Sequence, residues 1–164
     1  MTELKLVVKT MKKSTAMNNE YINQIKELKQ SIIIVQKERL IYQSKGFGLW
    51  PLYHFYKKND PYFPIAVYDK VTGTGAARIL IALGNVELIY TNVITENAYT
   101  LLKDHNITVH YDQMVKHILN KAKNDLCPVE KISLNSEDFS SFMNNLDVFY
   151  LNVKDVYEKS FLND

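Results

Sequence analysis

The residues best suited to chemistry lie in the segment from Ile65 to Ala77, which reads IAVYDKVTGTGAA. In this segment an apolar run ends at the charged pair Asp69 and Lys70, and a turn rich in glycine and threonine leads into a stretch of small residues. This order is typical of a buried strand followed by a helix. Ligands of open α/β sheets bind at such junctions, because the first N–H groups of a helix have no partner within it.

The pair Asp69 and Lys70 is a candidate catalytic pair. At the end of a strand the two side chains could orient a polar substrate or share a proton with it. The structural alternative is that Asp69 caps a turn and Lys70 forms an exposed ion pair of little energetic value.

The turn after this pair, which contains Thr72, Gly73, Thr74 and Gly75, is a candidate ligand-binding loop. Its hydroxyl and backbone N–H groups could hold a phosphate. Alternatively, Gly75 and the two alanines that follow it only allow the helix to pack closely on the sheet. A dinucleotide site is not expected, because Arg78 stands where the fingerprint needs its third glycine.

A second candidate is the segment from Cys127 to Glu130, which is typical of a helix start and resembles a capping box. Cys127 is the single cysteine of the chain, so an internal disulfide is excluded. A thiol at a helix N-terminus is a candidate nucleophile, with Glu130 or a nearby histidine as its base. The alternative is a small buried hydrophobic residue.

A third candidate is the start of an earlier helix, where Gly48 and Trp50 lie close together. The indole of Trp50 could stack on a ring of a ligand, although a tryptophan at such a position is more often part of the core. The four histidines are scattered without the spacing of metal ligands, so neither a metal nor a cofactor is expected.

The elements that position these residues follow from the apolar pattern. A β-branched run at 32–35 predicts a buried strand, paired in a hairpin with 40–42. Further strands are expected near 65–68, 86–90 and 107–111, and helices near 49–56, 74–83, 95–106 and 112–122, with later helices starting at 127 and 136. This alternation predicts a three-layer α/β/α sandwich with a mixed, mostly parallel sheet.

The chain is expected to divide into three parts. Residues 1–28 form an N-terminal extension with an amphipathic helix, residues 29–146 form the α/β domain, and residues 147–164 form an aromatic tail that packs on the domain or on a partner.

Composition narrows the possible partners. The formal net charge is only +2, so nucleic acid is not an expected partner. No apolar run approaches the roughly 20 residues that span a bilayer, and no secretory signal pattern is visible. These observations predict a cytoplasmic protein that is not associated with membranes.

Three segments carry a resemblance to a known family: 46–52 (GFGLWPL), 68–77 (YDKVTGTGAA) and 126–131 (LCPVEK). In their order and separation they resemble a family of uncharacterised bacterial proteins with a cytidine-deaminase-like fold. The resemblance covers about 31–132 and implies the fold rather than an activity. Deaminases hold zinc through His or Cys at the first helix start and two Cys at the next. Residues 45–51 contain no His, Cys or Glu and residues 69–77 contain no Cys, so zinc-dependent deamination is not expected.

Two functional hypotheses follow. The first is a domain that binds a nucleotide-like or phosphorylated small molecule, or a metal-independent enzyme on the same scaffold, with its pocket between the helix starts that follow Gly48 and Gly73. The second is a non-catalytic interaction module, such as a homodimer formed through the N-terminal helix and the aromatic tail.

Overall fold

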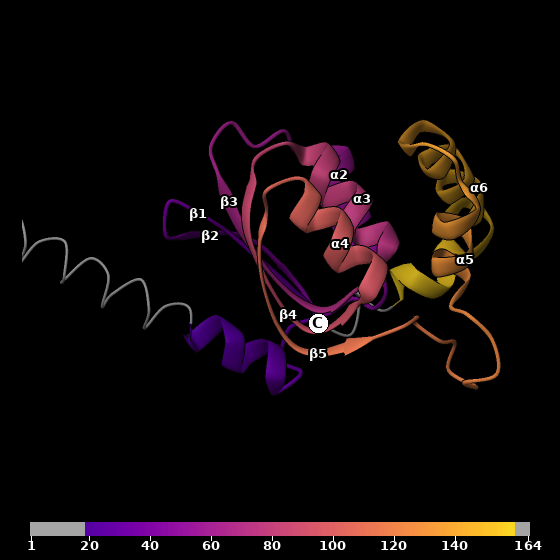
Figure 1. The fold of residues 1–164 in the computed structure, drawn as a ribbon, viewed down its shortest axis with the longest axis horizontal. Helices are drawn as coiled ribbons and strands as arrows, with labels where there is room; N and C mark the ends of the chain where they lie inside the picture. The colour runs from indigo at the N-terminus through magenta and orange to yellow at the C-terminus, as the bar shows by residue number, and fades with distance from the viewer. Residues whose placement is uncertain (1–18, 160–164) are drawn as a thin grey trace, which may run out of the picture.

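The computed structural model describes residues 19–159, which form an α/β fold around one five-stranded sheet (Figure 1). A first helical segment covers residues 19–26. The elements that follow are β1 (Ile32–Gln36), β2 (Arg39–Ser44), α2 (Trp50–Lys58), β3 (Ile65–Thr72), α3 (Thr74–Leu83), β4 (Val86–Thr95), α4 (Glu96–Asp104), β5 (Thr108–Val115), α5 (Pro128–Asn135) and α6 (Phe139–Glu158).

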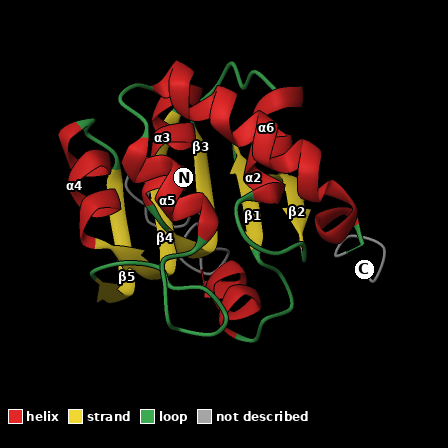
Figure 2. Cartoon of the chain, turned by 90° about the vertical axis from the view of Figure 1, so that its right-hand side faces the viewer, coloured by secondary structure: helices red, strands yellow, loops and turns green. Residues whose placement is uncertain are grey.

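The sheet is mixed, as the sequence predicts, and its strand order is β2-β1-β3-β4-β5 (Figure 2). Strand β1 pairs antiparallel with both β2 and β3, whereas β3, β4 and β5 pair parallel. The expected hairpin therefore supplies the one strand of this sheet that runs against the others. The crossover helices α3 and α4 connect the parallel strands, and the carboxyl ends of these strands meet at one edge.

Both faces of the sheet carry apolar side chains. Ile32 and Ile34 of β1 join the main core beneath α2, α3 and α4, whereas Ile33 and Val35 face the opposite side. There the helical segment 19–26 covers the sheet (Figure 1), and its Ile25 is fully buried. A strand that is covered on both faces reads as an uninterrupted apolar run, which explains the sequence of β1.

Helices α2 and α3 confirm the expected starts. Pro51 lies in the first turn of α2, and α3 begins at Thr74 and ends before Gly84, which has a φ of 75°. Strands β3 and β4 are longer than the apolar runs indicate. Asp69 and Lys70 therefore lie within β3 rather than beyond its end.

The helix predicted over 112–122 is wrong. Strand β5 continues to Val115, which pairs with Thr95 of β4. The segment after β5 has no helix and contains a single bridge between Leu119 and Leu126. Apolar residues in this region have a helical spacing, but pairing with a distant strand overrides that local preference.

The C-terminal tail is helical up to Glu158, because α6 continues through residue 146 without a break. Tyr150 is 2% exposed, and its ring packs on that of Trp50 with the centroids 4.5 Å apart. Both the first helical segment and the tail therefore contribute buried side chains to the same body. The three-part division of the chain stays a prediction, and the part of it that concerns 1–18 and 160–164 lies outside the described residues.

Tyr90 connects the sheet to the segment 19–26, and its removal should cost stability. Its hydroxyl donates to Asp112 Oδ2 at 2.6 Å, and Lys26 Nζ lies 3.4 Å from the same oxygen. We expect Tyr90→Phe to lower the free energy of unfolding by about 1 kcal/mol, since Asp112 is partly exposed and water can replace the lost donor. Urea denaturation measures this change.

The control is Tyr111→Phe, at an exposed position of β5, for which we expect a change below about 0.5 kcal/mol. Equal effects of the two substitutions would show that the Tyr90 hydroxyl does not hold the segment.

A cavity between the starts of α2, α3 and α5

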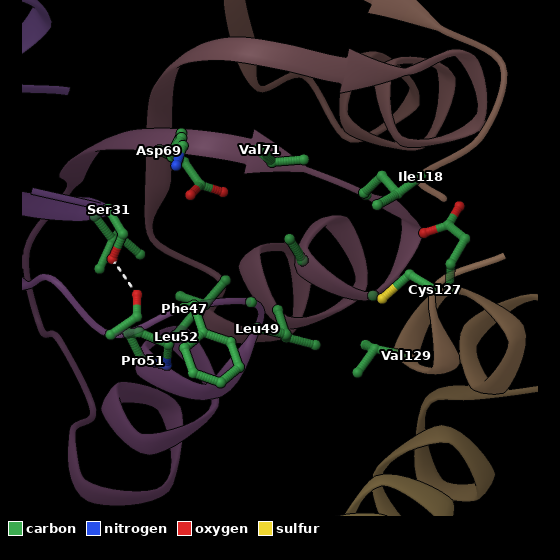
Figure 3. Close-up of a pocket in the computed structure, with 18 of the residues that line it drawn as sticks. Ser31, Phe47, Leu49, Pro51, Leu52, Asp69, Val71, Ile118, Cys127 and Val129 are labelled. Atoms are coloured by element: carbon green, nitrogen blue, oxygen red, sulfur yellow. Dashed lines mark hydrogen bonds between the residues drawn. The ribbon is translucent and has the colours of Figure 1, made fainter. Parts of the chain in front are cut away.

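A cavity of about 270 Å³ lies where the starts of α2, α3 and α5 meet the end of β3 (Figure 3). Most of its wall is apolar, supplied by side chains that include Phe47, Leu49, Val71, Ile118 and Val129. Known small-molecule sites are mostly apolar and range from about 300 to 1,000 Å³. The volume of this cavity lies just below the lower end of that range, so it suits only a small ligand or one end of a larger ligand.

Polar side chains from three different parts of the chain interrupt the apolar wall. They are Lys45 after β2, Asp69 and Lys70 on β3, and Cys127 and Glu130 at the start of α5. Figure 3 shows the Asp69 carboxyl group and the Cys127 sulfur turned toward the interior. The edge near β2 is fixed by Ser31, whose hydroxyl donates to the carbonyl oxygen of Gly46.

Asp69 is held in the wall by its own strand. Its backbone lies between β1 and β4, paired with Ile32 and Thr91, and its Oδ2 accepts a hydrogen bond from the Thr72 hydroxyl at 2.9 Å. Although the residue keeps some exposure toward the cavity, burial raises the pKa of Asp69 to about 7. Hydrogen bonds from Thr72 and from the backbone of Val71 and Lys70 offset part of this effect. Asp69 can therefore exchange a proton near neutral pH.

Glu130 reaches from α5 to the N-terminus of α3. Its Oε2 accepts the backbone N–H of Thr74 at 3.3 Å, and its Oε1 accepts the Thr74 hydroxyl at 3.0 Å. The carboxyl group thus provides the cap that Gly73, the N-cap residue, cannot supply with a side chain. Burial raises the pKa of Glu130, and the hydrogen bonds from Thr74 and the charge of His117 oppose this shift.

Gly73 leaves room for this close approach. A Cβ at Gly73 would lie 2.6 Å from Glu130 Oε2 and 2.5 Å from the end of the Ile118 side chain. Gly48 has a different role, because its φ of 64° lies in the left-handed region that favours glycine. These two glycines therefore shape the walls of the cavity.

The structure brings together most of the residues selected from the sequence. Those that line the cavity are Gly48, Asp69, Lys70, Gly73, Gly75, Cys127 and Glu130. Thr72 and Thr74 lie just behind its wall, where their hydroxyl groups bind Asp69 and Glu130 rather than an incoming ligand. Direct contact of these two hydroxyls with a ligand stays a prediction.

Trp50 does not line the cavity. The side chain is 4% exposed and packs among Tyr53, His54 and Tyr150. Trp50 is therefore a core residue, because α2 turns this position toward α6.

The sequence analysis did not select several residues that line the cavity. Phe47 lies next to the selected Gly48, and an aromatic residue between two glycines was the signal available in the sequence. Ile118 gave no signal, since it was assigned to a helix that does not form. The capping box at Cys127 was only half correct. Cys127 is the N-cap of α5, but its side chain makes no capping bond and Glu130 caps α3 instead.

Residues 19–159 contain neither a metal-binding cluster nor a membrane-spanning helix. No group of three or more His, Cys, Asp or Glu side chains is arranged to hold a metal ion. Within the same range no helix combines the length and apolar character needed to cross a membrane.

Comparison with known proteins gives a family and a fold. The model of a family described as a domain of unknown function (DUF1893), named TM1506, matches residues 20–149. The crystal structure of the DUF1893 family protein TM1506 from Thermotoga maritima is similar, with a TM-score of 0.70 and 24% sequence identity. The alignment covers 80% of this chain and 88% of that one. At this identity the likeness concerns the fold. No curated protein matches the chain.

Proposed function

We propose that this chain, which belongs to the DUF1893 family of domains of unknown function, is a small-molecule-binding domain whose ligand occupies the cavity between α2, α3 and α5. One observation carries the proposal: two carboxyl groups from separate elements, Asp69 and Glu130, line an otherwise mostly apolar cavity. An apolar pocket with a few convergent polar groups and a perturbed pKa is the usual signature of a binding or active site.

The ligand class that fits best is a planar ring with a polar edge, such as a nucleoside or nucleotide. The ring of Phe47 is 38% exposed and lines the cavity, so it offers a surface for stacking. Lys45 and Lys70 are exposed side chains of the same cavity and can meet a phosphate outside it. For a metal-independent enzyme on this scaffold, Asp69 is the proton donor or acceptor.

The resemblance to the cytidine-deaminase-like fold supports this location. The order of hairpin, helix, strand and helix supports this proposed likeness, under which the cavity corresponds to the two helix starts where deaminases hold zinc. We propose the three-layer scaffold of those enzymes without their metal. The residues at both helix starts lack the His and Cys ligands of deaminases, and the carboxyl group of Glu130 occupies the start of α3.

Ligand binding can be measured through the single cysteine. We expect nucleosides, nucleotides or ADP-ribose to raise the melting temperature and to slow the alkylation of Cys127 by iodoacetamide, because Cys127 lines the cavity. The blocking variant is Val71→Trp, which places an indole at the partly exposed cavity residue Val71. The matched control is Val148→Trp, at an exposed position of α6.

Protection that is present in wild type and in Val148→Trp but lost in Val71→Trp supports the proposal. Absence of any melting shift and of any protection across the whole panel would overturn it, as would protection that persists in Val71→Trp.

The second candidate function is an interaction module that forms a homodimer. The observation that favours it is the exposure of three apolar side chains on α6, which are Val148, Leu151 and Val156. The face of the helical segment 19–26 that holds Ile25 packs on the sheet of its own chain. Light scattering of wild type and of Leu151→Lys tests this candidate. A monomer in both cases contradicts it.

A further inference from the structure

We infer that the cavity selects a ligand whose buried end is a cationic or N–H-rich head group, such as an amidine, held by the carboxyl group of Asp69 or of Glu130. Any anionic part of the ligand stays outside, beside Lys45 and Lys70. This inference rests on the proposed function, because it names the chemistry of the ligand that the same cavity takes.

The start of α3 is closed to an anion. Helix N-termini commonly bind phosphate through their free N–H groups. Here Glu130 accepts the N–H of Thr74 at 3.3 Å and fills the space beside Gly73, where a Cβ would lie 2.6 Å from Oε2. A phosphate at this position would have to displace a buried carboxyl group, which is 2% exposed as a residue.

The hydrogen bonds around the two carboxyl groups leave acceptors facing the cavity. Asn97 Nδ2 donates to Thr74 Oγ1 at 3.2 Å, so the single hydroxyl proton of Thr74 points to Glu130. The Thr72 hydroxyl donates to Asp69 in the same way. Since these protein neighbours of both carboxyl groups donate, the carboxyl oxygens act as acceptors in the wall, and a ligand that brings donors matches them better than one that brings acceptors.

The charges of the cavity are separated by depth. Its ionisable side chains are Lys45, Asp69, Lys70, Cys127 and Glu130, and His117 acts on Glu130 from the segment after β5. Glu130 is buried and Asp69 is partly buried, whereas both lysines are exposed. A cationic group inside the cavity is attracted to these poorly solvated carboxylates. An anionic group inside the cavity is repelled by them. The same arrangement accommodates a nucleotide with an amino-bearing base inside and its phosphate outside.

The test uses three ligands of matched shape that differ in charge: benzamidine, benzamide and benzoate. Each is titrated against the rate of Cys127 alkylation by uncharged iodoacetamide at pH 7.5. We expect benzamidine to give half-maximal protection at a concentration at least tenfold below that of benzoate, with benzamide between them. Asp69→Asn should reduce this ratio to below threefold, and Glu130→Gln should reduce it in part. Lys103→Gln, which changes an exposed side chain of α4 outside the cavity, should leave benzamidine unaffected.

Each outcome bears on either the further inference or the proposed function. Equal or better protection by benzoate overturns the inference, and so does an unchanged ratio in Asp69→Asn. Protection by nucleosides or nucleotides but by none of the three probes also overturns it, and then the proposed function stands if Val71→Trp removes the protection. Protection by no compound of either set overturns the proposed function itself.

Discussion

Replacing Asp69 with asparagine should stabilise the protein at pH 8 by about 2 to 4 kcal/mol while changing its stability little below pH 4. The folded pKa of Asp69 is about 7, against an ordinary value of 3.8. Between these two pH values the unfolded chain has released a proton that the folded protein still holds. Stability therefore falls as the pH rises through this window, and the full cost is present above the folded pKa. Asparagine does not ionise and still accepts the Thr72 hydroxyl, so the variant lacks this cost.

Urea denaturation of wild type and Asp69→Asn between pH 4 and pH 8.5 measures the effect. The difference between the two proteins isolates Asp69, since the other titrating groups are common to both. Asp60→Asn, in an exposed loop, is the matched control and should follow wild type at every pH. Parallel pH profiles for wild type and Asp69→Asn would mean that the carboxyl group of Asp69 is well solvated, and the account of the cavity would fail with it.

Replacing Glu130 with alanine should lower the free energy of unfolding by about 2 to 3 kcal/mol at pH 7. The substitution leaves the buried N–H and hydroxyl of Thr74 without their acceptor and opens a void at the start of α3. Glu130→Gln keeps the volume and one acceptor oxygen, so we expect a loss of about 1 kcal/mol. Burial already disfavours the charged form of Glu130, which limits the cost of the amide.

Urea denaturation measures the loss of stability, and hydrogen exchange at the Thr74 amide locates it at the start of α3. Glu137→Ala is the control, because Glu137 is exposed at a neighbouring turn. Wild-type stability in Glu130→Ala, with unchanged exchange at Thr74, would contradict the role of Glu130 as the cap of α3.

Local signals in the sequence were sufficient to predict the helices beside the cavity. Pro51 marks the first turn of α2, and Gly84 ends α3 in the left-handed conformation. The uninterrupted apolar run of β1 predicted a strand that is buried on both faces. These features depend on residues within a few positions of each other, which is why a single sequence reveals them.

The contacts that form the site, in contrast, join residues that are far apart in the sequence. Glu130 and Thr74 are 56 residues apart, and nothing near Glu130 in the sequence distinguishes a cap on its own helix from a cap on another. Ile118 reaches the cavity from a segment whose spacing predicts a helix. Asp69 was selected for its place at the end of an apolar run, yet its raised pKa follows from the walls that distant segments build around it. The sequence therefore identified the residues that line the cavity better than it identified the residues that they contact.

The most direct test of the cavity as a site for a cationic head group is a crystal structure of the protein grown with benzamidine. The account predicts electron density for the ligand in the cavity, with the amidine nitrogens within about 3.2 Å of the Asp69 or Glu130 carboxyl oxygens. Benzamidine bound only outside the cavity, or a cavity closed by the side chains of Phe47 and Ile118 with no ligand density, would contradict it.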